Sequence, residues 1–143
     1  MNILISACLC GCTCRYDGKN KNSIDLSKLD GHNLFPVCPE VDGGLSIPRA
    51  PAERVGPYII TNEGNDVTEQ YKRGAEIALK TALENGCTVA ILKARSPSCG
   101  KGEIYDGSFT HTVIEGNGVT TELLEANRIK VFTEKDFDTS NLF

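Results

Sequence analysis

Short apolar runs alternate with amphipathic segments along this 143-residue chain, and this alternation constrains the fold more than any other feature. Branched apolar runs bounded by turns are typical of buried strands, and we expect them at 2–7, 34–37, 88–93 and 129–132. Apolar residues at helical spacing predict helices over 66–85 and 119–127. Strands that alternate with helices predict an α/β fold: a mostly parallel sheet of about four strands with flanking helices.

The helix over 66–85 is the clearest element, and Gly86 favours an end directly after it. Its expected buried positions are Val67, Tyr71, Ala75, Ala78, Leu79, Ala82 and Leu83. A shorter helix is expected from a Ser23 cap to Leu29. Pro36 lacks an N–H group, so the strand at 34–37 is expected to be short or to lie at a sheet edge.

The segment from 39 to 57 contains four prolines and a Gly-Gly pair, which predicts a long irregular loop. A loop of that length inside a compact domain is usually functional. Residues 58–60 resemble one half of a small hairpin, and residues 109–115 alternate weakly, as a minor strand does. No repeat or linker divides the chain, so residues 1–143 are expected to form a single domain.

Composition excludes several classes of protein. The 15 basic and 19 acidic residues leave a net charge of −4 without a basic cluster, which argues against binding nucleic acid by charge. No apolar run approaches the roughly 20 residues of a membrane span, and the first residues do not resemble a signal peptide. The expectation is a small soluble protein of the cytoplasm.

Seven cysteines are many for such a chain, and an odd number argues against a disulfide framework. The chain has no Cys-x2-Cys pair of the kind that binds structural zinc. His32 and His111 are expected to be surface or packed residues. The tract from Cys8 to Cys14 has a cysteine at every second position, of which Cys10 and Cys12 are equally well explained as incidental small residues. Cys87 opens a buried strand and is expected to pack in the core.

Three cysteines stand where expected strands end. Cys8 follows the first strand, Cys38 the second, and Cys99 lies in the loop after the third. Parallel strands end at one edge of a sheet, where open α/β sheets bind ligands, so these thiols are expected to meet there. Iron–sulfur clusters are held by cysteine thiolates, and three cysteines would leave one iron of a cubane open for substrate.

Three motifs carry a resemblance to a known family. They are Ser6-Ala7-Cys8-Leu9-x-Gly11-x-x-Cys14-Arg15-Tyr16-Asp17-Gly18, Pro36-Val37-Cys38-Pro39-Glu40-Val41-x-Gly43-Gly44-Leu45-x-Ile47-Pro48-Arg49 and Lys93-x-Arg95-Ser96-Pro97-Ser98-Cys99-Gly100. Together they resemble a domain-of-unknown-function family associated with thiouracil desulfidases. The resemblance implies an α/β fold with a [4Fe-4S] cluster on Cys8, Cys38 and Cys99. It also implies a non-redox reaction that removes sulfur from a thiolated pyrimidine. Cys14 belongs to the family pattern, but the resemblance gives it no role.

Several motif residues fit the chemistry of replacing C=S by C=O. Glu40 is placed for proton transfer, although a structural ion pair with Arg49 or Arg15 explains it equally well. Ser96 is a candidate catalytic hydroxyl, and Ser98 is a candidate substrate contact, although both suit ordinary turns. The further candidates for substrate binding are Arg15 and Tyr16.

Arg49, Lys93 and Arg95 are basic residues in these loops. They would hold an anion or charge near a cluster, or would simply form surface ion pairs.

Two other functions remain open on the sequence alone. One is a cysteine-rich module that binds zinc or copper, and the other is a carrier of persulfide sulfur on Cys14 or Cys99. The desulfidase reading implies two kinds of partner: a small thiolated nucleobase or nucleoside, and the iron–sulfur assembly machinery.

Overall fold

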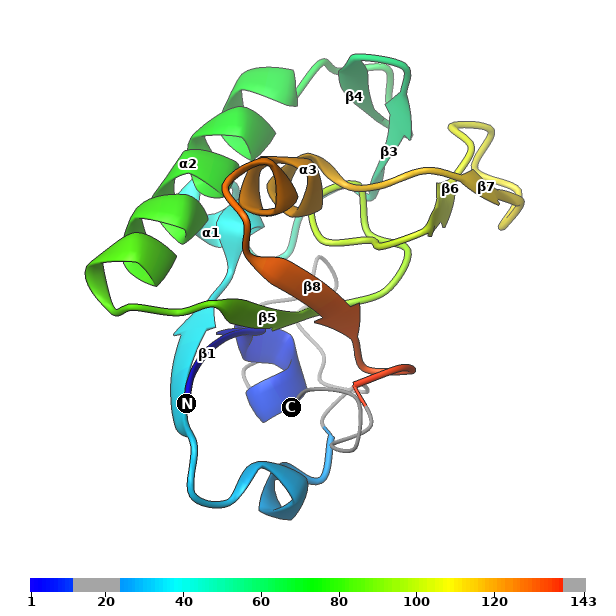
Figure 1. The fold of residues 1–143 in the computed structure, drawn as a ribbon. Coiled ribbons are helices and arrows are strands. Elements are labelled where there is room, and N and C mark those ends of the chain that lie inside the picture. Colours follow the sequence, from blue (N-terminus) through cyan, green and yellow to red (C-terminus); the bar gives the residue numbers. More distant parts are fainter. Residues whose placement is uncertain (12–23, 138–143) are drawn as a thin grey trace.

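The computed structural model of the protein describes residues 1–11 and 24–137, and its centre is a four-stranded parallel sheet (Figure 1). The order across the sheet is β2-β1-β5-β8. The strands are β1 (Asn2–Ser6), β2 (Asn33–Val37), β5 (Val89–Leu92) and β8 (Lys130–Thr133). The α/β fold and all four main strands of the prediction are therefore confirmed.

Burial explains which strands are central. The side chains of Ile3, Leu4 and Ile5 in β1 are completely buried, and every residue of β5 is buried as well. Strands covered on both faces need such continuous apolar runs. Pro36 lies in β2 at the edge of the sheet, as predicted, where its missing N–H group costs no ladder hydrogen bond.

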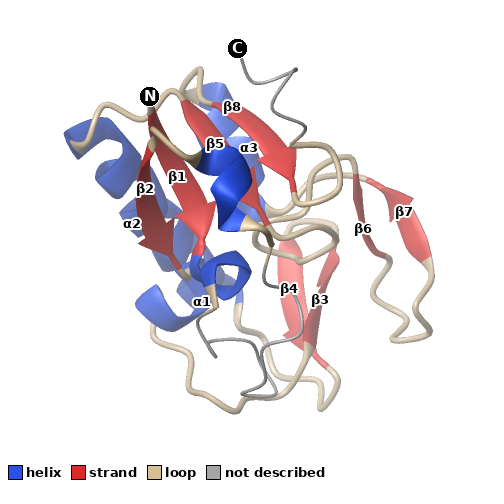
Figure 2. Cartoon of the chain, turned by 90° about the horizontal axis from the view of Figure 1, so that it is seen from below, coloured by secondary structure: helices blue, strands red, loops and turns tan. Residues whose placement is uncertain are grey.

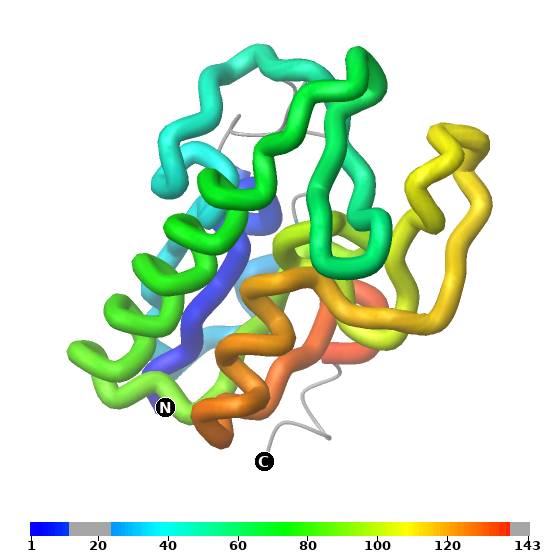
Figure 3. Tube along the Cα trace, turned by 90° about the horizontal axis from the view of Figure 1, so that it is seen from above, coloured from blue at the N-terminus to red at the C-terminus, as the bar shows by residue number. Residues whose placement is uncertain are grey.

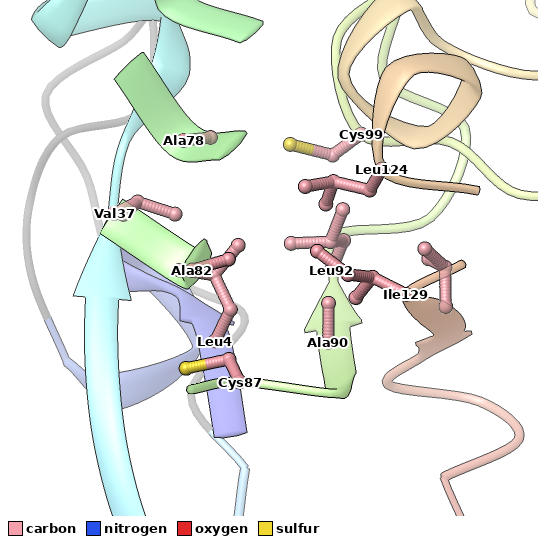
Figure 4. Close-up of a cluster of buried hydrophobic side chains, with 11 residues drawn as sticks. Leu4, Val37, Ala78, Ala82, Cys87, Ala90, Leu92, Cys99, Leu124 and Ile129 are labelled. Atoms are coloured by element: carbon pink, nitrogen blue, oxygen red, sulfur yellow. The ribbon is translucent and has the colours of Figure 1, made fainter. Parts of the chain in front are cut away.

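Helices α2 (Thr68–Glu84) and α3 (Val119–Ala126) lie side by side over one face of the sheet (Figure 3). Between helices and sheet is an apolar cluster, most of which Figure 4 shows: Leu4, Val37, Ala78, Ala82, Cys87, Ala90, Leu92, Cys99, Leu124, Ile129 and Val131. The expected burial of Leu83 is wrong, because this side chain is 59% exposed. Each helical residue turns by about 100°, so Leu83 points away from the face that buries Ala82.

None of the helices in the described ranges is both long enough and apolar enough to cross a membrane.

The opposite face of the sheet is covered by two 3-10 turns, η1 (Ala7–Cys10) and η2 (Leu26–Leu29). Leu9 and Leu29 pack there against Ile3 and Ile5. The helix expected between Ser23 and Leu29 is only this single turn, with Asp25 as its cap: Asp25 Oδ1 accepts a hydrogen bond from Ser27 N at 3.0 Å. Ser23 lies outside the described residues.

Two small hairpins stand beyond the sheet (Figure 2). One pairs β3 (Ala52–Val55) with β4 (Tyr58–Thr61), and the other pairs β6 (Glu103–Tyr105) with β7 (Val113–Glu115). The stretch from 39 to 57 is therefore less irregular than expected, because it also contains helix α1 (Pro39–Asp42). The hairpin half at 58–60 and the minor strand within 109–115 are both present, whereas the sequence did not reveal β6.

Helix α1 approaches the backbone of α2 unusually closely, and two glycines make this contact possible. A Cβ atom added at Gly43 would lie 1.9 Å from the carbonyl oxygen of Gln70. A Cβ added at Gly74 would lie 1.8 Å from the carbonyl oxygen of Pro39. Neither contact is sterically allowed, so the absence of a side chain at both positions fixes α1 against α2.

We predict that Gly74→Ala destabilises the fold by about 1–3 kcal/mol, because the added methyl group forces α1 away from α2. Within a helix this substitution otherwise stabilises by about 1 kcal/mol, so the two explanations predict opposite signs. Urea unfolding of the variant measures the difference, with Glu76→Ala on the exposed face of α2 as a control for helix propensity. An unchanged or higher unfolding midpoint for Gly74→Ala would contradict the close contact.

Candidate functional site

A cavity of about 600 Å³ lies at the carboxyl ends of the parallel strands, and Cys8, Cys38 and Cys99 all line it. Cys8 belongs to the turn directly after β1, and Cys38 is the residue between β2 and α1. Cys99 comes from the loop that follows β5. The structure therefore brings together the three strand-end cysteines that the sequence singled out.

The three thiols are protected from solvent to different degrees. Cys8 and Cys99 are 8% and 4% exposed, and Cys38 is half-buried. Burial, together with nearby Cys38, raises the pKa of Cys8 to about 11, and the positive charge of Lys93 opposes the shift. Burial also raises the pKa of Cys99, against the lowering effect of its hydrogen bond with Ser98. These thiols therefore favour the neutral form unless a positively charged group joins them.

The remaining cysteines lie elsewhere or outside the described residues. Cys87 is 4% exposed and packs at the other end of the apolar cluster from Cys99 (Figure 4), which confirms its predicted place in the core. Cys10 packs against the cluster on the opposite face of the sheet. Cys12 and Cys14 fall outside the described ranges.

Glu40 lines the same cavity and accepts several hydrogen bonds. Arg49 donates to its Oε2 atom from Nε at 3.1 Å and from Nη2 at 2.9 Å. The hydroxyl of Tyr71 donates to the same oxygen at 3.1 Å, whereas Oε1 has a longer contact of 3.4 Å with Ser96 Oγ. The structural ion pair with Arg49 is thus present, and it leaves Oε1 directed at the loop that contains Cys99.

Tyr71 is a site residue that sequence reasoning missed. Its place on the apolar stripe of α2 predicted only core packing, and it is indeed 2% exposed. Burial, together with the charge of Glu40, raises the pKa of the Tyr71 phenol above its ordinary value. The phenol therefore stays protonated and donates to Glu40. Nothing in the sequence marks a helical tyrosine 31 positions away as the partner of Glu40.

Ser96 organises the loop before Cys99. Its hydroxyl oxygen accepts hydrogen bonds from the backbone N–H groups of Ser98 at 3.0 Å and Cys99 at 3.1 Å. Ser96 also lines the cavity beside Glu40, so both its expected roles, turn residue and site residue, are compatible with its position.

The expectation that Ser98 contacts substrate is not supported, because this residue is completely buried and does not line the cavity. The Ser98 hydroxyl lies 2.7 Å from Thr120 Oγ1 in α3 and accepts a hydrogen bond from the Cys99 thiol at 3.6 Å. Ser98 therefore links the Cys99 thiol to α3. Arg15 and Tyr16, the other predicted substrate contacts, lie outside the described residues.

The three basic residues that the sequence motifs contribute to the cavity, Arg49, Lys93 and Arg95, each have an acidic partner. Besides Arg49 with Glu40, Lys93 Nζ lies 2.7 Å from Glu134 Oε2, and Arg95 Nε lies 3.4 Å from Glu103 Oε2.

Glu134 follows β8 and was not identified from the sequence. Its Oε1 atom also accepts a hydrogen bond from Ala94 N at 2.7 Å, which holds the loop that follows β5.

The β6–β7 hairpin contributes Tyr105, Phe109 and His111 to the cavity, and we call these three residues the aromatic wall. The rings of Tyr105 and His111 meet edge to face, with centroids 5.9 Å apart. His111 was expected to be an ordinary surface or packed residue, and it is exposed but also forms part of this wall. The sequence did not mark the wall, because its members belong to no motif of the chain.

Comparison with known proteins identifies the family. The chain is 42% identical over 147 residues to the uncharacterized protein YbbK of Bacillus subtilis (strain 168), covering 95% of this chain and 97% of YbbK. A solved structure described as [4Fe-4S]-dependent thiouracil desulfidase TudS is 44% identical, with a TM-score of 0.91 over 99% of this chain and 95% of that chain. The family model for 2-thiouracil desulfurase matches residues 3–136. The protein therefore belongs to the 2-thiouracil desulfurase family.

Proposed function

We propose that this protein is a desulfidase that removes sulfur from a thiolated pyrimidine, with water supplying the oxygen that replaces it. The observation that carries the proposal is the meeting of Cys8, Cys38 and Cys99 with Glu40 at one cavity. The similar solved structure is named as a [4Fe-4S]-dependent thiouracil desulfidase, which supports both the reaction and the cofactor.

The three cysteines fit a [4Fe-4S] cluster. Within residues 1–11 and 24–137, no three Cys, His, Asp or Glu side chains converge on a position for a single metal ion. A polynuclear cluster needs no such convergence, because each cysteine binds a different iron. Burial disfavours free thiolates at Cys8 and Cys99, so iron supplies the positive charge that their ionisation requires. We therefore assign Cys8, Cys38 and Cys99 as the ligands.

A bound cluster would supply Lewis-acid chemistry for the departing sulfur, at an iron that none of the three cysteines would hold. The net exchange converts a thiocarbonyl and water into a carbonyl and hydrogen sulfide. The oxidation state does not change, so the reaction needs no electron donor. Proton transfer and the positioning of water are then the roles of Glu40 and Ser96.

Glu40 is proposed as the proton acceptor for the attacking water. Arg49 and Tyr71 hold its Oε2 atom, which fixes the carboxylate and leaves Oε1 toward Ser96 and the cavity. Ser96 Oγ, 3.4 Å from Oε1, is placed to share a proton with it and to orient the water or the substrate. Arg15 and Tyr16 stay proposals for substrate binding on the strength of the motif alone.

The two other functions gain no support from the structure. A zinc or copper module would bring thiols together on one ion, which the described residues do not do. A persulfide carrier on Cys99 needs a thiol that a partner protein can reach, whereas Cys99 is only 4% exposed. The same alternative on Cys14 falls outside the described residues. For a cluster enzyme, we expect the cluster to be delivered by iron–sulfur assembly proteins.

We predict that replacing Cys8, Cys38 or Cys99 by Ser prevents cluster assembly, because each substitution removes one ligand. Anaerobic reconstitution followed by iron and sulfide analysis measures the outcome, and the unsubstituted protein should contain about four of each. Cys87→Ser is a matched control, since Cys87 is as buried as Cys99 but does not line the cavity. A full cluster in Cys38→Ser would overturn the ligand assignment.

We predict that Glu40→Gln keeps the cluster but lowers kcat by about 10²–10⁴-fold, because the amide cannot accept a proton from water. Release of sulfide from 4-thiouracil measures turnover, and the absorption spectrum reports the cluster. Glu76→Gln, the same substitution on the exposed face of α2, should change neither quantity. Undiminished turnover in Glu40→Gln would reduce Glu40 to a structural partner of Arg49.

A further inference from the structure

The aromatic wall is a part of the cavity that the proposed chemistry does not use. Tyr105 and Phe109 are half-buried, and with His111 they line the same cavity as the three cysteines and Glu40. The wall belongs to the β6–β7 hairpin, which follows the Cys99 loop in the chain. The Cys8 and Cys38 loops are far from it in sequence. A planar, heteroaromatic substrate would therefore meet aromatic side chains in this cavity as well as polar groups.

The backbone of the wall adopts a conformation that bulky residues rarely take. Phe109 and His111 have φ angles of 58° and 59°, in the left-handed region. Aromatic residues persist there only where the surrounding structure holds them, and such residues occur preferentially at ligand clamps and active sites.

Glu53 is the group that holds this backbone in place. Its side chain is 8% exposed, and its Oε1 atom accepts hydrogen bonds from Gly107 N at 2.9 Å and Phe109 N at 3.2 Å. Gly107 has a φ angle of 96°, and a Cβ added there would lie 2.5 Å from Val55 Cγ2. The hairpin is thus pressed against β3, and a buried carboxylate of β3 fixes the backbone on either side of residue 108.

We propose that the aromatic wall binds the substrate by stacking on the face of its pyrimidine ring, with Phe109 as the principal contact and Glu53 as the residue that positions Phe109. This inference rests on the proposed function for its choice of ligand. Stacking recognises the flat face that all pyrimidines share rather than the position of the sulfur. The cavity is therefore expected to bind 2-thio and 4-thio pyrimidines with similar strength.

Kinetics on the cluster-loaded enzyme test the contact. Phe109→Leu keeps apolar volume but removes the ring, so KM for 4-thiouracil should rise about 10-fold to 100-fold while kcat and cluster content stay unchanged. Phe109→Tyr keeps the ring and should restore the original KM. Ile114→Ala, at an exposed position of β7 that does not line the cavity, is the control and should leave KM unaltered. An unchanged KM in Phe109→Leu would overturn the proposal.

A binding measurement separates this proposal from the proposed function. The chain contains no tryptophan, so Phe109→Trp introduces a single indole at the wall. We expect 2-thiouracil to quench its fluorescence in a saturable manner. Tyr58→Trp, at an exposed position that does not line this cavity, should show only the weak linear loss caused by absorption.

Saturable quenching in Phe109→Trp without any turnover by the original protein would disprove the desulfidase activity but support pyrimidine binding at the aromatic wall. Turnover together with equal quenching in both tryptophan variants would disprove the wall alone.

The positioning role of Glu53 has its own signature. Glu53→Ala removes the acceptor for the two N–H groups and should raise KM about as much as Phe109→Leu, with kcat retained. Glu53→Gln keeps an acceptor oxygen and should recover most of the affinity. A residue that served only folding would lower thermal stability or cluster content without shifting KM, and that result would overturn the assignment.

Discussion

The shared edge at which β1, β2 and β5 end is the constraint on which the site depends. Parallel pairing sets Ser6 of β1 beside Val37 of β2. The residues that follow these two strands therefore line the same cavity. The hydroxyl of Ser6 also accepts a hydrogen bond from Lys93 N at 3.0 Å, which ties the end of β5 to that of β1. Backbone pairing therefore brings the loops that contain Cys8, Cys38 and Cys99 to one edge of the sheet.

Around this edge, two groups of contacts keep the polar residues in order. Gly43 and Gly74 let α1 lie against the backbone of α2, and this contact carries Glu40 to the hydroxyl of Tyr71. The pair of Lys93 with Glu134 places a positive charge beside Cys8 and balances it with a carboxylate that follows β8. The Arg49–Glu40 and Lys93–Glu134 ion pairs are both partly buried, so the attraction within each pair is stronger than it would be in bulk water.

Sequence reasoning identified what local patterns determine. Apolar runs located the strands, and the strand ends led to Cys8, Cys38 and Cys99 at one cavity. It could not find Tyr71, because a buried tyrosine on an apolar helix face looks like any core residue until its partner is known.

The burial of Ser98 could not be predicted for a similar reason. Whether a loop hydroxyl faces the cavity or α3 depends on packing that its neighbours in sequence do not encode.

The central claim is that this cavity exchanges sulfur for oxygen without a change of oxidation state. The most direct test gives the anaerobically reconstituted protein 4-thiouracil in ¹⁸O-labelled water, with no reductant, and analyses uracil by mass spectrometry and sulfide by colorimetry. The account predicts equal amounts of sulfide and uracil, and that the uracil contains the heavy oxygen. Sulfide release that requires an electron donor, or uracil without the label, would contradict it.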